Sequence, residues 1–198
     1  EAAEAAGIPE GSVQFVDTSD RQAVTDLIHM NGLVDVVIPR GGAGLIKTVV
    51  MNATVPVIET GAGVCHTFID ASADVEMAMK ICYNAKVQRP SVCNAMETLL
   101  VHKDAAEKFM PSMLAKYFEA GVEIRGDERV QAFSDKVVPV TEEDWSTEYG
   151  DLRLSVKIVD SLEEAMEHIA KYTTYHSECI VTEDYENART FQLGVDAA

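Results

Sequence analysis

Basic residues are scarce in this chain of 198 residues, where 16 Lys and Arg side chains stand against 33 Asp and Glu, for a net charge of −17. Because a protein must present positive charge to displace counterions from phosphates, this balance argues against a nucleic-acid-binding surface. Long apolar runs are also missing: the stretch 55–58 is far shorter than the roughly 20 residues that cross a bilayer. We therefore expect neither nucleic acid nor membrane among the partners of this protein.

Cysteines are few, and no two of them are spaced as Cys-x-x-Cys. The four thiols are those of Cys65, Cys82, Cys93 and Cys179. This spacing argues against a zinc ribbon or a thioredoxin-type motif, and the number is low for a disulfide-stapled secreted fold. Cys65-His66 and His176-x-x-Cys179 each offer two metal ligands, but neither has a companion pair. We interpret the cysteines as reduced thiols of a cytoplasmic protein that holds no metal.

Short runs rich in β-branched residues alternate with helical patterns along the chain. Strands are expected at 13–16, 34–38, 55–58, 64–69, 98–102, 122–125, 153–159 and 178–182. Helices are expected after the capping box 19–22, after 40–44, at 72–86, from Asp104 to 120 with a break at Pro111, after the capping box 161–164, and from 184. This alternation predicts an α/β fold with a largely parallel sheet, and the glycine-rich stretch 61–63 is the best candidate for a domain boundary.

Two features follow predicted strands, at the carboxyl ends where open parallel sheets bind ligands. The first is the glycine-rich turn 40–44, after which a helix begins whose free N–H groups can receive a phosphate. It is not a full dinucleotide fingerprint, and a tight turn without a ligand is the simpler interpretation. The second is Glu59, either a general base or a cap on the next backbone turn, of which the cap is the more common role.

Cys93 follows a Pro-Ser turn and precedes a predicted strand. The unpaired N–H groups of a turn can stabilise a thiolate and an oxyanion beside the attacked carbon. Arg89 would add positive potential, and Asn94 is a further candidate for a supporting residue. An arbitrary cysteine is nevertheless more often a small buried apolar residue than a nucleophile, so the turn alone does not decide the role of Cys93.

Several blocks of the sequence resemble the signature blocks of the γ-glutamyl phosphate reductases, a family within the aldehyde dehydrogenase superfamily. They are 38–46 (IPRGGAGLI), 57–66 (VIETGAGVCH), 84–102 (NAKxQRPSVCNAxETLLVH), 160–165 (DSLEEA) and 176–178 (HSE). The block around Cys93 is the most specific of them. Members of the family are about twice as long as this chain, so the resemblance implies that the chain is a middle piece.

The resemblance implies an aldehyde dehydrogenase-like architecture, in which residues 1–63 form the second half of a Rossmann-like NADP-binding domain. Residues 64–198 would form the cysteine-bearing catalytic domain, whose C-terminal part is missing. The implied reaction is the second step of proline biosynthesis, the reduction of L-glutamate 5-phosphate by NADPH to L-glutamate 5-semialdehyde and phosphate. Cys93 matches the family nucleophile, which forms a thioester with the substrate.

Further roles are implied by the same resemblance. Gly41 and Gly42 match the glycine turn near the cofactor pyrophosphate, and Glu148 loosely matches a ribose-binding glutamate. Glu59 matches the residue with which dehydrogenase relatives activate water, a reaction that a phosphate reductase must avoid, so Glu59 is expected to be structural or to face the cofactor. The family also implies a homo-oligomer, and we expect the isolated 198 residues to be inactive.

Two alternative functions stay open from the sequence. The first is an NAD(P)-dependent aldehyde dehydrogenase that oxidises its substrate to an acid with the same thiol chemistry. The segment 89–92 (RPSV) before the cysteine favours the phosphate reductase over this alternative. The second is a folded piece that keeps Cys93 without turnover and serves in binding or assembly.

Overall fold

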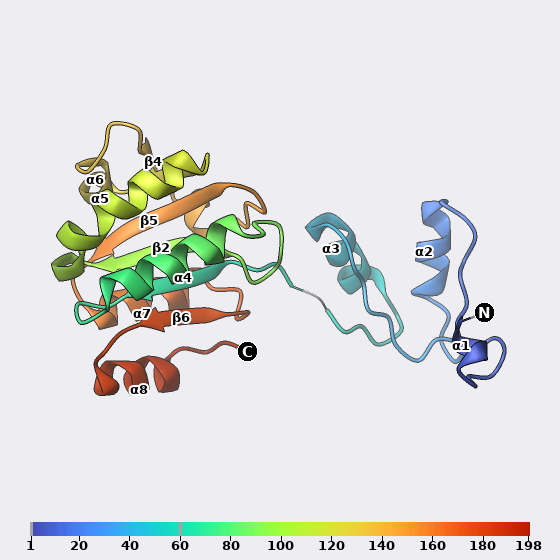
Figure 1. Ribbon diagram of the computed structural model, residues 1–198. Coiled ribbons are helices and arrows are strands. Elements are labelled where there is room, and N and C mark those ends of the chain that lie inside the picture. Colours follow the sequence, from blue (N-terminus) through green and yellow to red (C-terminus); the bar gives the residue numbers. More distant parts are fainter. Residues whose placement is uncertain (1, 60) are drawn as a thin grey trace. The chain divides into compact units, whose positions relative to one another are not determined.

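The computed structural model describes residues 2–59 and 61–198 (Figure 1). The chain divides into two compact units, residues 1–60 and residues 61–198, here called unit 1 and unit 2. The division falls three residues before the expected boundary at residue 63, at the edge of the glycine-rich stretch. That unit 1 belongs to a cofactor domain and unit 2 to a catalytic domain stays a prediction.

The described residues of unit 1, 2–59, contain three helices, α1 (Ala2–Ala5), α2 (Arg21–Leu27) and α3 (Ala43–Asn52). The helices after 19–22 and after 40–44 are thus confirmed, and the Asp20 side chain caps α2 by accepting from the backbone N–H of Gln22. The three strands expected here are wrong. Within the described part of unit 1, β pairing is limited to one parallel bridge between Val37 and Val57.

The missing strands have a simple physical reason. An extended segment becomes a strand only when its N–H and C=O groups pair with a neighbouring backbone. The Val37 N–H donates to the Pro56 carbonyl at 2.8 Å and the Ile58 N–H to the Val37 carbonyl at 2.9 Å, and there the ladder ends. Segment 13–16 exposes Val13 and Phe15 to solvent. A run of β-branched residues favours an extended backbone, but it forms a strand only when a partner strand pairs with it.

Unit 2 is built on a six-stranded sheet in the order β4-β3-β5-β2-β1-β6, in which every neighbouring pair is parallel. Its strands are β1 (Cys65–Ile69), β2 (Met96–His102), β3 (Glu123–Gly126), β4 (Val138–Pro139), β5 (Arg153–Val159) and β6 (Glu178–Val181). β1 is buried along its whole length and β2 up to its last residue, as expected of central parallel strands covered on both faces. The predicted α/β fold with a parallel sheet is confirmed, and only β4 was not expected.

Helices cover both faces of this sheet (Figure 1). α4 (Val75–Val87) and α5 (Lys103–Glu119) pack on one face, where Leu99 and Val101 of β2 join their core. α7 (Leu162–Tyr172) and α8 (Tyr185–Gly194) pack on the other face against Phe68 and Leu100. Because successive strand residues point to opposite faces, one apolar strand supplies both cores. The short helix α6 (Glu128–Gln131) and the 3₁₀ turn η1 (Glu143–Ser146) complete the unit.

The helix α5 differs from its expected form at both its start and its middle. It begins at Lys103, one residue before the expected start at Asp104, and the Nδ1 atom of His102 caps it by accepting the Asp104 N–H at 3.1 Å. It also continues through Pro111 without a break. Pro111 is on the exposed side, where water can serve the carbonyl that loses its partner, while Phe109 and Met113 bury the opposite side. Packing of that apolar side outweighs a proline cost of about 3 kcal/mol.

The other helix ends of unit 2 follow their sequence signals. Asp74, Ser161 and Asp184 cap α4, α7 and α8 by accepting backbone N–H groups with their side chains. Gly121 ends α5 with φ of +78°, a conformation that favours glycine. Among the described helices, none is long and apolar enough to span a bilayer.

Candidate active site

Cys93 lies in the loop of residues 88–95, which joins the end of α4 to the start of β2. Of the four cysteines it is the one whose residue is exposed. Two turns shape the loop, in which the Val92 N–H donates to the Arg89 carbonyl and the Ala95 N–H to the Val92 carbonyl. The backbone N–H groups of Cys93 and Asn94 have no acceptor among the described residues, so they are available to an oxyanion near the thiol.

Two residues at the start of β1 contact the backbone of this loop: Cys65, the first residue of the strand, and Gly63, two residues before it. The Cys65 thiol donates to the carbonyl oxygen of Cys93 at an Sγ–O distance of 3.4 Å. Gly63 packs against the same carbonyl so closely that a Cβ atom on Gly63 would lie 1.7 Å from the oxygen. The backbone of Cys93 therefore rests on a surface that a side chain at position 63 would fill.

A buried ion pair lies where the loop leaves and enters regular structure. Lys86 in the last turn of α4 is 0% exposed and Glu97 in β2 is 1% exposed, and their Nζ and Oε2 atoms are 2.6 Å apart. Burial lowers the pKa of Lys86 and raises that of Glu97, and the charge of each partner opposes the shift of the other. The second carboxylate oxygen, Oε1, accepts the Gly150 N–H at 3.1 Å.

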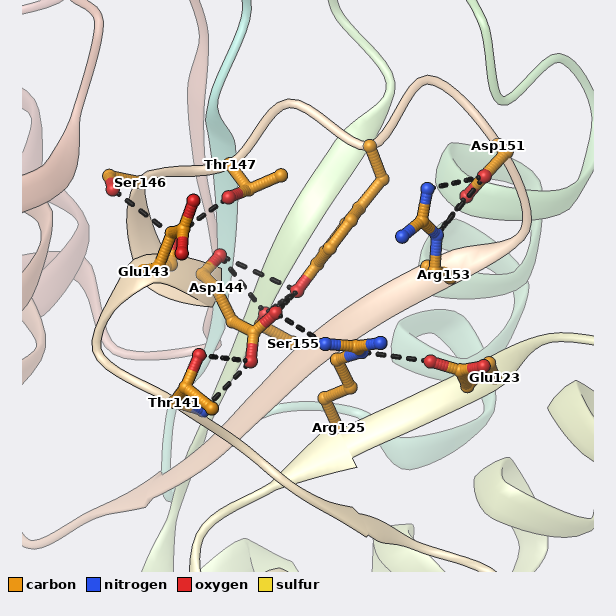
Figure 2. A network of polar contacts seen from close by, with 11 residues as sticks. Glu123, Arg125, Thr141, Glu143, Asp144, Ser146, Thr147, Asp151, Arg153 and Ser155 are labelled. Carbon is orange, nitrogen blue, oxygen red and sulfur yellow. Dashed lines mark hydrogen bonds and ion pairs between the residues drawn. The ribbon is translucent and has the colours of Figure 1, made fainter.

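The segment that carries Glu148 and Gly150 is itself fixed by a polar network around Asp144 (Figure 2). Asp144 accepts from the N–H and hydroxyl of Thr141, from Arg125 of β3 at 2.8 Å, and from the Tyr149 hydroxyl at 3.0 Å. Burial alone would raise the pKa of Asp144, but these donors lower it below its ordinary value. The network thus anchors residues 141–150 against β3 and β5.

These contacts gather at the amino ends of three neighbouring strands. Gly63 precedes β1, Cys93 precedes β2 and Gly150 precedes β5, and the sheet order places these strands side by side. General experience with open parallel sheets points to the carboxyl ends, which is where sequence analysis places the glycine turn and Glu59. In unit 2 the exposed thiol of Cys93 lies at the opposite end of the strands, next to their amino ends.

The other predicted site residues have the following places. Arg89 and Asn94 are exposed on either side of Cys93, and Glu148 is exposed in the segment that Glu97 holds through Gly150. Gly41, Gly42 and Glu59 belong to unit 1, where Glu59 is exposed. The roles of Arg89, Asn94, Glu148, Gly41, Gly42 and Glu59 stay predictions.

Four residues near Cys93 received no role in its support from the sequence: Gly63, Cys65, Lys86 and Glu97. All four lie inside the quoted signature blocks. The signal that could have found Lys86 and Glu97 is a lysine and a glutamate at the two ends of the cysteine loop. Cys65 and His66, weighed as metal ligands, have other partners, because the Nδ1 atom of His66 lies 3.0 Å from the buried Glu178 carboxylate. Within residues 2–59 and 61–198, no group of three or more His, Cys, Asp or Glu side chains is arranged to hold a metal ion.

We predict that Cys93 reacts fastest of the four thiols with a limiting amount of iodoacetamide. Burial raises the pKa of Cys65 to about 12 and also raises the pKa values of Cys82 and Cys179, so these thiols stay neutral and shielded. Peptide mapping by mass spectrometry should show Cys93 labelled roughly tenfold or more ahead of each of the others. Faster labelling of Cys82 or Cys179 in the folded protein would contradict this order.

Unit 2 is thus an α/β unit with a parallel sheet covered by helices on both faces, and its exposed cysteine lies on a turn before the central strand β2. A family model described as the aldehyde dehydrogenase family matches residues 1–132. The chain therefore belongs to the aldehyde dehydrogenase family.

Within this family, the chain is most similar to proteins of one kind among the relatives compared. The chain is 59% identical over 197 residues to a γ-glutamyl phosphate reductase of Moorella thermoacetica and 56% identical over 198 residues to one of Caldanaerobacter subterraneus subsp. tengcongensis. All of this chain but only 47% and 48% of those proteins are covered, so the chain spans about half the length of these relatives. The crystal structure of a γ-glutamyl phosphate reductase from Thermotoga maritima superimposes with a TM-score of 0.92 at 49% identity, covering 99% of this chain and 47% of that one.

Proposed function

We propose that the protein carrying this chain reduces L-glutamate 5-phosphate with NADPH to L-glutamate 5-semialdehyde and phosphate. The observation that carries the proposal is that Cys93, alone among the four thiols, is exposed on a turn whose N–H groups at residues 93 and 94 find no acceptor within the described chain. The relatives that match the whole chain are γ-glutamyl phosphate reductases, which supports this substrate class.

The chain's own residues would act in the following order. The Cys93 thiolate attacks the acyl carbon, a C–S bond forms, and the bond from carbon to the phosphate oxygen breaks as phosphate leaves with the electron pair. The backbone N–H groups of Cys93 and Asn94 stabilise the oxyanion. NADPH, when bound, would supply the hydride that reduces the thioester. The tetrahedral oxyanion then held on Cys93 collapses to the aldehyde, and the C–S bond breaks with its electron pair returning to the Cys93 sulfur as thiolate.

The glycine turn of unit 1 fits a phosphate group of such a cofactor. Gly41 has φ of +150°, and Gly42 caps the ten-residue helix α3 without any side-chain hydrogen bond to its first turn. No heavy atom lies within 4 Å of the position of a Cβ on Gly42, so the turn offers open space at a helix N-terminus. We propose that Gly41 and Gly42 hold the pyrophosphate, with Glu148 on the ribose.

Oxidation of an aldehyde to an acid is the competing activity of the same thiol chemistry. It needs a general base that delivers water to the thioester, for which Glu59 is the candidate in this chain. A reductase must leave the thioester intact until hydride arrives. We therefore assign Glu59 a structural or cofactor-facing role, in agreement with the RPSV segment before Cys93.

The reverse reaction separates these activities in a single assay. We predict that the complete protein reduces NADP⁺ in the presence of glutamate 5-semialdehyde only when phosphate is added, because phosphate must release the acyl group from Cys93. An aldehyde dehydrogenase would reduce the cofactor without phosphate, since water releases the acid. A folded piece without turnover would show neither signal. Phosphate-independent turnover would therefore overturn the proposed reaction.

We further propose that this protein works in the cytoplasm as a homo-oligomer. The four cysteines form no disulfide, which fits a reducing compartment. The oligomer follows from the family resemblance alone, and sedimentation of the complete protein would test it.

A further inference from the structure

The loop that carries Cys93 is closed at its base by a side-chain contact between its two ends. Lys86 and Glu97 are eleven residues apart in the chain and pair at 2.6 Å with both side chains buried. The loop itself is exposed at Arg89, Ser91, Cys93 and Asn94. Its placement therefore depends on the few buried groups at its base.

Glu97 also joins this loop to a second one. Its Oε1 atom accepts the N–H of Gly150, and the preceding residue, Tyr149, is fixed through its hydroxyl to Asp144 and to Ser155 of β5 at 3.0 and 2.8 Å. The Lys86 ammonium lies 5.9 Å from the centre of the Tyr149 ring. One carboxylate thus touches both the lysine at the start of the cysteine loop and the segment next to Glu148.

Stability alone explains this pair poorly. Taking two charges out of water costs several kcal/mol per ion, so replacing a buried ion pair with apolar residues of similar volume is often neutral or stabilising. An apolar pair would, however, leave the Gly150 N–H without its acceptor. The contact that an apolar pair cannot provide is the connection between the two loops, from Glu97 to the Gly150 N–H.

We propose that Lys86 and Glu97 are a positioning pair that holds Cys93 in register with the segment 148–150. The pair touches neither substrate nor cofactor in this role, which rests on the function proposed above. By fixing the two loops to each other, it sets the distance between the attacking thiol and the cofactor site that Glu148 is proposed to form. A nucleophile displaced by about 1 Å loses about a hundredfold in rate.

Double variants of the complete protein separate positioning from stability. Lys86→Met or Glu97→Met alone leaves a buried charge unpaired and should lower the melting temperature strongly. The double variant Lys86→Met/Glu97→Met removes both charges and should recover most of that loss. We nevertheless expect its kcat to fall about 100-fold with a KM for the acyl phosphate within about threefold, and its Cys93 alkylation to slow roughly threefold.

A second double variant, Lys86→Met/Glu97→Gln, keeps an acceptor for Gly150 and loses only the link between the loop ends. Its kcat should fall about tenfold, an intermediate loss. Lys103→Met is the matched control, because it removes an exposed ion pair with Asp160 beyond the carboxyl end of β2 and should change none of these values.

Wild-type kcat and Cys93 alkylation in the folded Met/Met variant would overturn the proposal. Should that variant fail to fold, wild-type values in the Met/Gln variant would overturn it instead. The alkylation rate is independent of turnover, so it tests the positioning role even if the wild-type protein proves to have no reductase activity. Failure of the proposed function and failure of this inference are therefore distinguishable.

Discussion

Replacing Cys93 with serine should abolish acyl-phosphate reduction in the complete protein, with a loss of about 10³-fold or more in kcat. A serine hydroxyl is a far weaker nucleophile than a thiolate unless an adjacent base removes its proton. The described neighbours of Cys93 provide no such base, since Cys65 is itself a donor to the Cys93 carbonyl and the Glu97 carboxylate is engaged by Lys86 and Gly150.

The same variant should keep its affinity for NADPH within about twofold, because the proposed pyrophosphate contacts lie on Gly41 and Gly42 and do not involve the thiol. Calorimetric titration with NADPH and a steady-state assay measure the two properties separately. Cys179→Ser is the matched control, which removes a half-buried thiol of β6 and should leave turnover intact. Retained turnover in the Cys93→Ser protein would exclude the covalent mechanism.

Gly63→Ala adds one methyl group next to the Cys93 loop, and we expect it to lower both the stability and the activity of the protein strongly. The new Cβ would lie 1.7 Å from the carbonyl oxygen of Cys93 and 2.7 Å from its carbonyl carbon, distances that only a shift of the backbone can relieve. Because the obstacle is main chain and not the tip of a flexible side chain, we expect a loss of about 3 kcal/mol in the free energy of unfolding. The displaced loop should also lower kcat about 100-fold.

Thermal unfolding and the reductase assay measure these effects, and Gly61→Ala provides the control. Gly61 lies two residues earlier in the same segment, and no heavy atom is within 4 Å of the position of its Cβ. Equal behaviour of the two variants would show that the close approach between Gly63 and Cys93 does not hold the loop. A loss confined to Gly63→Ala would show that it does.

Much of unit 2 could be predicted from the sequence, because its local signals and its packing agree. β5 was expected at residues 153–159 and is found there, and Ser161 caps α7 as its capping box predicts. The β-branched run of β5 pairs with β2 and β3, and the Ser161 side chain accepts the Glu164 N–H. The signature block around Cys93 likewise indicated the thiol that the structure leaves exposed.

Where a signal needed a distant partner, the sequence was a poorer guide. The runs at 13–16, 34–38 and 55–58 have strand composition, yet they form one bridge, because a ladder requires a paired backbone that composition cannot supply. The expected break at Pro111 was wrong for the opposite reason, since the burial of Phe109 and Met113 overrides the local cost of a proline.

The sequence by itself determined the family and the parallel α/β sheet and singled out Cys93 as the candidate nucleophile, because motif, period and capping are local properties of the chain. Only the tertiary structure decided what surrounds Cys93. Cys93 contacts Gly63 and Cys65, and Glu97 contacts Lys86 and Gly150. These contacts join segments that the strand order brings together at the amino ends of β1, β2 and β5. Such contacts depend on distances of a few ångströms between residues up to 53 positions apart, and spacing in the chain does not encode those distances.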